Sequence, residues 1–218
     1  MIKVENVEVW GFEHAVRGVR NPLASWNKSD SGWEQANFCD SVFMIGDNDL
    51  DLMRRLYQAS LTGNFAHRKF LRQIFVSMDI TAPLYWWKEM DQYKVGTTTN
   101  SCSTMHTIHR TGIDESLFSF DGGKSLTEDE KRVTNQFLQM LEKWRTDCKS
   151  GDETWRNLIQ WLPEGFNQKR TITMNYENVV TMIMQRAGHK LSEWNEFVEI
   201  IKTLPYIKEI TEDKEKIK

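Results

Sequence analysis

The sequence is poor in cysteine and has no long apolar run. Its three cysteines, Cys39, Cys102 and Cys148, are an odd number at scattered positions among 218 residues. Such a set argues against a disulfide framework and for a reducing, intracellular setting. No apolar run approaches the roughly 20 residues that a membrane-spanning helix needs, and the charged, alternating N-terminal segment lacks the apolar core of a signal peptide. We therefore expect a cytoplasmic protein without membrane contact, in which the glycosylation sequon at Asn27 occurs by chance.

A strong basic charge is also missing. The formal net charge is -3, from 28 lysines and arginines against 31 aspartates and glutamates, so a nucleic-acid polymer is not expected as a partner. Aromatic residues are plentiful in contrast, with nine tryptophans among them. Many rings beside amides and hydroxyls favour a core that extends to a pocket for a flat ligand.

The N-terminal half shows both extended and helical patterns. Residues 2–10 alternate apolar and polar side chains and predict a strand, whereas residues 20–48 are rich in loop-forming residues and predict mostly loop. Residues 49–61 have apolar residues at helical spacing behind an acidic start. Residues 70–80 are the best strand candidate, and a helix is expected from Pro83, whose missing N–H costs nothing in a first turn.

The C-terminal half predicts a series of helices. The first covers residues 126–145 and opens on a capping box formed by Thr127 and Glu130. Three more are expected over 153–162, from an asparagine cap at Asn175, and from Ser192 to the residue before Pro205. Residues 208–218 are a highly charged tail that is expected to fray. These patterns predict one α+β domain over residues 1–207, with a small central sheet and a helix-rich C-terminal half.

Two motifs have a chemical interpretation beside a plain one. Cys102, His106 and His109 form a C-x3-H-x2-H pattern that can place three metal ligands on one side of a helical turn. No fourth ligand follows and Gly112 comes soon after, so we favour ordinary polar packing and expect no metal. The segment 121–126, DGGKSL, resembles the end of a phosphate loop, but the first glycine of that motif is missing, which favours a plain turn.

Cys102 has a second interpretation as a nucleophile. Thiolates form readily beside cations, and Lys94, His106 and Arg110 lie near Cys102 in the sequence. The alternative is an inert small side chain, which is the commoner role of a lone cysteine. The sequence leaves both open.

Residues 82–106 place an aromatic helix before a loop of small hydroxyl, amide and thiol residues. Neighbouring helical residues point about 100° apart, so Trp86 and Trp87 cannot both face one ligand. We expect one of them in the core and the other at an interface or pocket wall. The loop fits the lining of a ligand site, where Gly96 permits close approach of the backbone; the alternative is a surface loop at a subunit contact.

The stretch from Ala66 to Met105 carries an ordered set of short motifs. Ala66–His67 is followed by Gln73, then by the predicted strand and by a helix that opens on Ala82–Pro83. This order resembles, without a gap, the flavin-dependent thymidylate synthases, which methylate dUMP without the usual cysteine nucleophile. Their signature is G-H-x-x-P-x-E-H, a strand, a helix opened by A-P, and R-H-R-x-x-S-x-x-E-x-S-x-R-Y. Ala66–His67 falls on its Gly-His pair and Gln73 on its second His.

The following helix and loop depart from the family's pattern. Lys88 and Glu89 occupy positions that many members fill with Arg and Gln. Lys94 and Thr97 are conservative replacements for the second Arg and the first Ser, and Cys102 lies at the second Ser. The non-conservative positions are Gln92, Tyr93, Asn100, Thr104 and Met105.

A second match lies downstream. Leu162–Pro163 and the segment from Asn175 resemble the family's L-P followed by N-x-R-x-L-x-x-F-L-x-L-R. Asn175 and Arg186 fall on its Asn and its last Arg, and Glu177 replaces an Arg. Together the two matches imply the fold of that family.

The resemblance also implies a chemistry and a set of site residues. It implies a homotetramer that binds a pyrimidine deoxynucleotide and FAD, with NADPH and methylenetetrahydrofolate as co-substrates. The residues implied at the flavin are His67, Gln73, Lys94, Thr97 and Asn175. Those implied at the nucleotide are Lys88, Glu89, Gln92 and Arg186. Asn100 and Cys102 are implied at the pyrimidine or its ribose, as the catalytic positions; a thiol there can add to the C6 carbon.

The departures leave a rival interpretation open. Replacing a charged contact by a neutral hydrogen bond costs about 1–2 kcal/mol, and Arg68, Arg72 and Arg110 are candidates to compensate. The first alternative is a non-catalytic nucleotide-binding or assembly module that keeps the fold. The second is a structural protein that binds no ligand.

Overall fold

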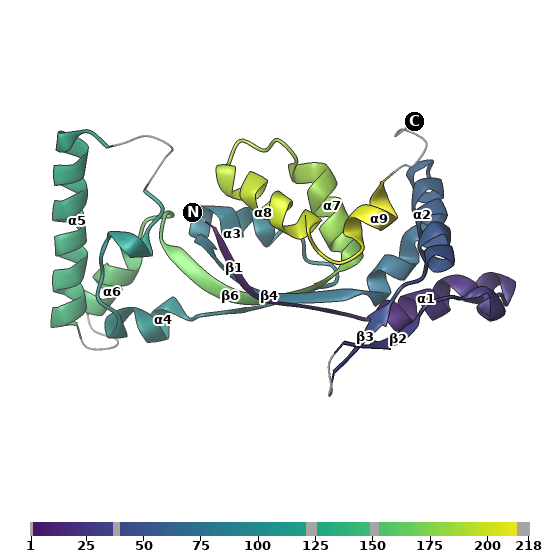
Figure 1. Ribbon diagram of the computed structural model, residues 1–218. Coiled ribbons are helices and arrows are strands. Elements are labelled where there is room, and N and C mark those ends of the chain that lie inside the picture. The colour runs from purple at the N-terminus through teal and green to yellow at the C-terminus, as the bar shows by residue number, and fades with distance from the viewer. Residues whose placement is uncertain (1, 37–39, 121–125, 149–152, 213–218) are drawn as a thin grey trace. The chain divides into compact units, whose positions relative to one another are not determined.

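The computed structural model describes residues 2–36, 40–120, 126–148 and 153–212. Helices and strands are mixed along the chain (Figure 1), which confirms the expected α+β class. The chain forms two compact units. The first unit comprises Met1–Glu5, Asp79–Tyr93 and Thr99–Ile172, and the second comprises Asn6–Met78, Lys94–Thr98 and Thr173–Lys218. The single domain over residues 1–207 stays a prediction.

A small sheet and a hairpin contain the strands. Four strands pair in the order β1, β4, β6, β5, and β2 pairs antiparallel with β3. Their bounds are β1 Lys3–Trp10, β2 Gly32–Gln35, β3 Ser41–Met44, β4 Phe75–Pro83, β5 Thr97–Ser101 and β6 Asn167–Asn175. Strand β1 confirms the strand predicted over residues 2–10.

The strand predicted over residues 70–80 is only half correct. Residues 75–83 form β4, in which Val76, Met78 and Ile80 alternate into the core. Residues 65–73 form a 3-10 helix, η3, instead. The reason lies in Phe70 and Leu71, which are neighbours and both buried. A half-buried strand turns successive side chains to opposite faces, so it cannot bury both on one side.

Four strands lie where no strand was expected, and two of them, β2 and β3, form a hairpin within residues 20–48, which were expected to be mostly loop. Strand β6 buries Ile172 and Met174 on alternate positions, but polar residues fill the rest of its sequence. Strand β5 occupies the predicted loop and ends the order of the four-stranded sheet. Its threonines have β-branched side chains that suit a strand. Four of its five residues are exposed, however, so the sequence shows no apolar alternation that would predict a strand.

The sequence predicts three of the helices of the second unit, α2, α7 and α8. The helices are α1 Phe12–Arg20, η1 Asn21–Leu23, η2 Trp26–Lys28, α2 Asp47–Leu61, η3 Phe65–Gln73, α7 Tyr176–Arg186, α8 Ser192–Lys202 and α9 Ile207–Thr211. Helix α1 and the 3-10 helices were not predicted, and most of α9 lies in the expected tail. Asn175 caps α7 as expected, because its side chain accepts a hydrogen bond from the Asn178 N–H. Helices α7 and α8 lie side by side (Figure 1), and α2 packs against η3 and α9.

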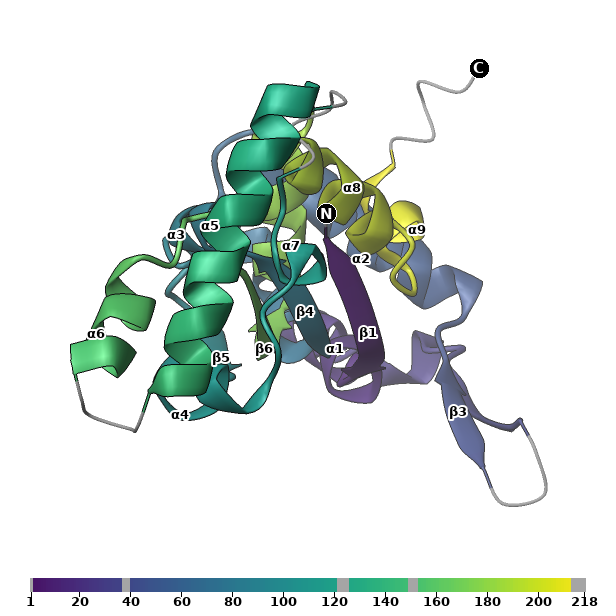
Figure 2. The same cartoon turned by 90° about the vertical axis from the view of Figure 1, so that its left-hand side faces the viewer.

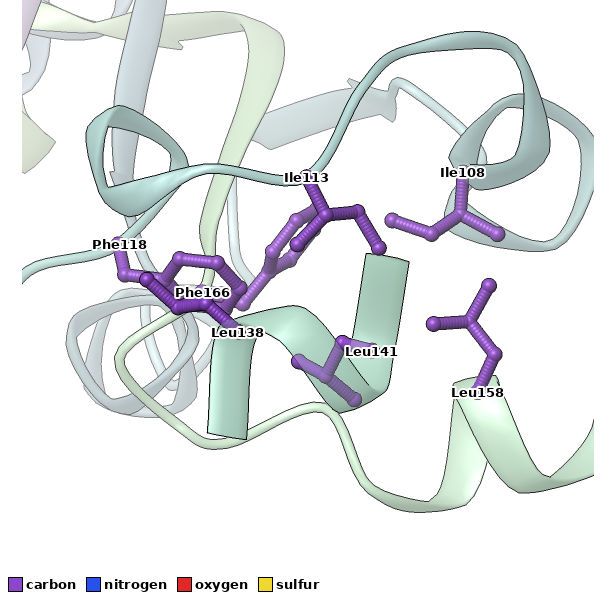
Figure 3. Packing of buried hydrophobic residues seen from close by; sticks show 7 residues of the cluster. All are labelled: Ile108, Ile113, Phe118, Leu138, Leu141, Leu158 and Phe166. Carbon is purple, nitrogen blue, oxygen red and sulfur yellow. The ribbon is translucent and has the colours of Figure 1, made fainter. Parts of the chain in front are cut away.

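The first unit has its own apolar core. Its helices are α3 Leu84–Met90, α4 Thr104–Thr107, η4 Ile108–Arg110, η5 Glu115–Leu117, α5 Glu128–Asp147 and α6 Glu153–Gln160. The predicted capping box is present at the start of α5, where Thr127 and Glu130 bond each other's backbone N–H. Figure 3 shows Leu138 and Leu141 of α5 packed with Leu158 of α6 and four other buried residues.

The expectation for the two adjacent tryptophans is wrong. Trp86 and Trp87 are both buried, and their rings meet edge to face at a centroid distance of 4.9 Å. The Nε1 of Trp87 donates to the carbonyl of Gln168 at 2.9 Å. Both rings therefore belong to the buried core.

The predictions for the C-terminal tail and for the segment 121–126 are tested only in part. Residues 208–211 of the expected tail lie in α9, where Ile210 is buried, and residues 213–218 lie outside the described residues. The segment 121–126 lies almost wholly outside them too, so its interpretation as a turn stays a prediction. Within the described ranges, none of the helices combines the length and apolar character that crossing a membrane requires.

Candidate functional site

The loop before β5 is attached to the start of α7 within the second unit. The Nδ2 of Asn178 donates to the carbonyl of Val95 at 2.8 Å and to the Oγ1 of Thr97 at 2.6 Å. The same residue's backbone N–H is capped by the Oδ1 of Asn175 at 3.1 Å. Three expected flavin residues, Lys94, Thr97 and Asn175, are therefore brought into one place. We call residues 94–98, which include the first two residues of β5, the α7 loop.

Gly96 is required at the centre of the α7 loop. Its φ is +76°, a left-handed conformation that favours glycine. A Cβ at this position would lie 2.4 Å from the Nδ2 of Asn175, a buried side chain. The loop backbone thus approaches the α7 cap more closely than any other residue type allows.

Replacing Gly96 by alanine is expected to lower the free energy of unfolding by about 1–2 kcal/mol, from the strained φ and the displaced cap. Urea unfolding followed by circular dichroism measures the change. The matched control is Gly112→Ala, because nothing lies within 4 Å of a Cβ at Gly112. Equal stability of both variants would contradict the close approach.

Two arginines of η3 meet a carboxylate of α7. The Nε of Arg68 lies 3.3 Å from Glu177, and Arg72 forms a shorter ion pair with the same carboxylate. Arg68 and Glu177 are largely buried, whereas Arg72 is exposed. The guanidinium of Arg68 also lies 5.0 Å from the ring centroid of Phe65. Arg68 and Arg72, which were candidates to replace a lost phosphate contact, are therefore both paired with Glu177.

This triad was missed, although the sequence carries a signal for it. When Gln73 is placed on the family's second His, Arg72 falls on the glutamate before it. Glu177 falls on an arginine of the downstream motif. The two charges are exchanged, and an exchange that keeps the pair opposite in sign points to a contact between them.

The remaining expected flavin residues lie at either end of η3. His67 is exposed, and its Nε2 lies 3.1 Å from the Nδ2 of Asn64. Gln73 packs its side-chain amide on Gly18 of α1, where a Cβ would meet its Oε1 at 2.5 Å. Gln73 thus supports the contact between η3 and α1.

Arg186 lies at the end of α7 and is half-buried. Its guanidinium stacks 4.5 Å from the ring centroid of Trp194, and its Nη1 lies 3.2 Å from the Nε2 of His189. A stacked guanidinium keeps N–H groups in its plane, so Arg186 retains the capacity to bind a phosphate.

The first unit holds the other expected nucleotide residues. Lys88 on α3 is exposed and pairs with Glu164 at 2.6 Å, Glu89 is half-buried, and Gln92 is exposed. A further cation was missed here: Arg170 of β6 donates to Asp91 at 2.8 Å and lies 4.3 Å from the Trp87 ring centroid.

The two expected catalytic residues lie on and just after β5. Asn100 and Cys102 are both exposed. The backbone of Cys102 is held on both sides, because its N–H donates to the carbonyl of Lys169 at 2.8 Å and its own carbonyl accepts from the Nε2 of Gln168 at 2.9 Å. Its Sγ lies 3.6 Å from the Oγ1 of Thr107. Among the described residues, no group of three or more His, Cys, Asp or Glu side chains is placed to hold a metal ion.

Solved structures match nearly the whole chain. Thymidylate synthase X from Helicobacter pylori, with FAD and dUMP, matches 98% of both chains with a TM-score of 0.66 and 16% sequence identity. The UMP/dUMP methylase PolB from Streptomyces cacaoi, bound with 5-Br UMP, matches over 96% of this chain and 93% of its own, with a TM-score of 0.62 and 15% identity. No protein-family model and no curated protein matches the sequence. The chain therefore has the fold of the flavin-dependent thymidylate synthases, which confirms that implication of the resemblance.

Proposed function

We propose that this protein methylates dUMP or a related pyrimidine deoxynucleotide in a flavin-dependent reaction with methylenetetrahydrofolate as carbon donor. The observation that carries the proposal is the match over 98% of the chain to a structure with FAD and dUMP. A second match, over 96% of this chain, is a UMP/dUMP methylase. We further propose FAD as the cofactor, NADPH as the electron source, and a cytoplasmic homotetramer as the active form.

The α7 loop fits a role in holding the flavin. Lys94 is exposed and offers one positive charge, and the left-handed Gly96 leaves the backbone uncovered by a side chain. Exposed hydroxyls follow along β5. Lys94 and the loop backbone, with His67, would hold the flavin, while Asn175 and Asn178 would keep the loop in place. The bound flavin supplies hydride transfer; this chain supplies binding and orientation.

The nucleotide phosphate requires cations that can be released from their present partners. Lys88 and Glu164 are both more than half exposed, and such surface pairs are worth about 1 kcal/mol or less. A phosphate can therefore replace Glu164 at Lys88. Arg186 would provide a second contact, because a planar guanidinium such as the one stacked on Trp194 matches the geometry of a phosphate.

One observation favours a second candidate function. Arg68 and Arg72 are paired with Glu177, and Gln92 and Thr104 carry no charge where the family has arginines. A non-catalytic module that binds a nucleotide more weakly and keeps the fold for assembly fits this loss of guanidinium groups.

The absorbance spectrum of the purified protein tests both candidates. FAD is titrated with and without dUMP, and the flavin bands are followed while size-exclusion light scattering reports the mass. A bound flavin whose spectrum shifts with dUMP supports the enzyme. Thermal stabilisation by dUMP without any flavin binding would favour the module and contradict the enzyme.

Cys102→Ser is expected to abolish turnover if its thiolate adds to C6 of the pyrimidine. In that step an S–C6 bond forms, the C5–C6 electron pair moves toward the C4 carbonyl, and elimination later reverses both changes. The spectral response to dUMP should persist, because a serine keeps the side chain's size. The control is Cys148→Ser, a half-buried thiol that bonds the Arg145 carbonyl. Full activity of Cys102→Ser would remove the nucleophile from the proposal.

A further inference from the structure

The second unit contains an apolar cavity at its N-terminal end, apart from the α7 loop and the η3 triad. Its volume is about 790 Å³, within the range of roughly 300–1,000 Å³ that small-molecule sites occupy. The end of β1, the first turn of α1, the β2–β3 hairpin and the start of α9 line it. None of the expected flavin, nucleotide or catalytic residues is part of this lining.

Aromatic rings form the walls of the cavity, and two of them face solvent. Trp33 of β2 is 61% exposed and Trp10 of β1 is 44% exposed. Each is backed by a second ring: Trp33 meets Phe43 edge to face at 5.4 Å, and Trp10 stacks on Phe75 at 5.9 Å. Such pairs hold indole faces in fixed orientations while leaving them accessible, which suits stacking with a planar ligand.

The hairpin that carries Trp33 has little other support. Seven of the eight residues of β2 and β3 are exposed, and the hairpin extends away from the body of the second unit (Figure 2). A two-stranded hairpin is marginally stable alone in water. A ring bound between Trp33 and the α1 side would bury apolar surface that the hairpin now exposes.

Tyr206 fixes the opposite wall. Its φ of +62° is uncommon for a residue with a large side chain. That conformation sets its ring edge to face on Phe12 at 5.1 Å and brings its hydroxyl to the N–H of Ile45 at 3.2 Å. Tyr206 thus links the start of α9 to the end of β3, where its hydroxyl also lies 3.8 Å from the Sδ of Met44.

The charges of the lining are negative. Glu13 and Glu209 contribute carboxylates, whereas no lysine or arginine lines the cavity among the residues that the structure describes. His14, also in the lining, lies 3.4 Å from the Nη2 of Arg17 on the next turn of α1. Two carboxylates disfavour a phosphate-bearing ligand, and exposed indole faces attract cations.

We propose that this cavity binds a planar aromatic cation, separately from the flavin and the pyrimidine nucleotide. The indoles of Trp33 and Trp10 stack on its rings, and Glu13 and Glu209 neutralise its charge. The site discriminates against anionic ring systems of the same size, nucleotides included.

Fluorescence anisotropy with proflavine, a planar tricyclic cation, tests the proposal. The full-length protein is titrated into the probe, with and without saturating FAD and dUMP, and pyrene-1-sulfonate serves as the planar anion. We expect saturable binding of proflavine at one site, unchanged by FAD and dUMP, and none of the sulfonate. Because this result needs no flavin binding, it stands or fails independently of the proposed enzyme function.

Variants locate the binding. Trp33→Ala should weaken proflavine binding about tenfold or more, the loss of one stacking contact, and Glu209→Gln should weaken it about threefold. Trp26→Ala is the matched control, since Trp26 is a similarly exposed tryptophan of the same unit outside the lining, and it should leave binding unchanged.

Three results would overturn the proposal. The first is equal weakening by Trp33→Ala and Trp26→Ala. The second is binding of pyrene-1-sulfonate as tight as that of proflavine. The third is no saturable proflavine binding below about 1 mM together with a smaller mass for Trp33→Ala, which would mean that a second copy of the chain covers the cavity.

Discussion

Replacing Asp49 by alanine is expected to lower the free energy of unfolding by about 3–5 kcal/mol, the cost of leaving a buried ionic partner uncompensated. The Asp49 side chain is fully buried at the start of α2 and accepts from the Nε of Arg20 at 2.6 Å. Ser29 and Ser31 donate to its other oxygen at 2.6 and 2.7 Å. The alanine variant leaves the buried guanidinium of Arg20 and the two serine hydroxyls without their acceptor. Urea unfolding, monitored by circular dichroism, measures the loss.

Asp51→Ala provides the matched control on the same helix. Asp51 is half-exposed and pairs with Arg54 and Arg55 at 3.3 and 3.1 Å. Exposed pairs of this kind contribute about 1 kcal/mol or less. A loss for Asp49→Ala that is no larger than the loss for Asp51→Ala would contradict the buried network.

The same network predicts a dependence on acid. Burial raises the pKa of Asp49, but the hydrogen bonds from Ser29, Ser31 and Arg20 together outweigh burial and leave the pKa below its ordinary value. The unfolded chain then binds the proton more readily, so this stabilisation is complete above the unfolded pKa of about 3.9 and is lost as the pH falls through the folded pKa. Urea midpoints between about pH 5 and 3 should therefore fall more steeply for the natural protein than for Asp49→Asn.

Local signals in the sequence predicted several of the helices, α5 and α7 among them, but not α1 or the 3-10 helices. The Thr127–Glu130 capping box and the Asn175 cap each specify a helix start through hydrogen bonds within three residues. Such signals need no knowledge of the rest of the fold. The order of motifs from Ala66 onward added what local signals lack, namely the fold itself, which the matches to solved structures confirm.

Long-range contacts explain what the sequence did not predict. Strand β6 becomes a strand because β4 and β5 flank it in the sheet, and its own polar residues give no clear alternation. Both tryptophans of α3 are buried, and Trp87 bonds the carbonyl of Gln168, 81 residues away along the chain. The Arg20–Asp49 pair spans 29 residues, a separation at which no periodicity links two side chains.

The candidate site also has residues that the sequence predicted and residues that only long-range contacts reveal. The sequence placed Lys94, Thr97 and Asn175 in one site through the resemblance, and the structure brings them together at the α7 loop. The role of Asn178, which bonds both Val95 and Thr97, could not be predicted because nothing in its local sequence differs from an ordinary helix residue. The expected site residues otherwise stay predictions until a ligand is measured.

Replacing Glu177 by arginine is expected to lower the free energy of unfolding by about 3–5 kcal/mol, because it puts a third guanidinium beside two others in a mostly buried place. Arg68 and Glu177 expose only 13% and 17% of their side chains, so water screens the repulsion poorly. Arg72 is 59% exposed, and Arg72→Glu alone should cost about 1 kcal/mol. Urea unfolding of the three variants, two single and one double, measures these losses.

The double variant Arg72→Glu/Glu177→Arg decides why the two charges are exchanged relative to the family's pattern. If Arg72 and Glu177 form a structural pair, the double variant should be more stable than Glu177→Arg alone, with a coupling of about 1–3 kcal/mol. Additive losses would contradict the pair. A structural pair also bears on ligand binding. Glu177 then stands where the family's arginine formed an ion pair, and its presence removes no contact to a phosphate. In that case the double variant should bind FAD and dUMP as the natural protein does, whereas tighter flavin binding by the double variant would show that the lost arginine had contacted the ligand.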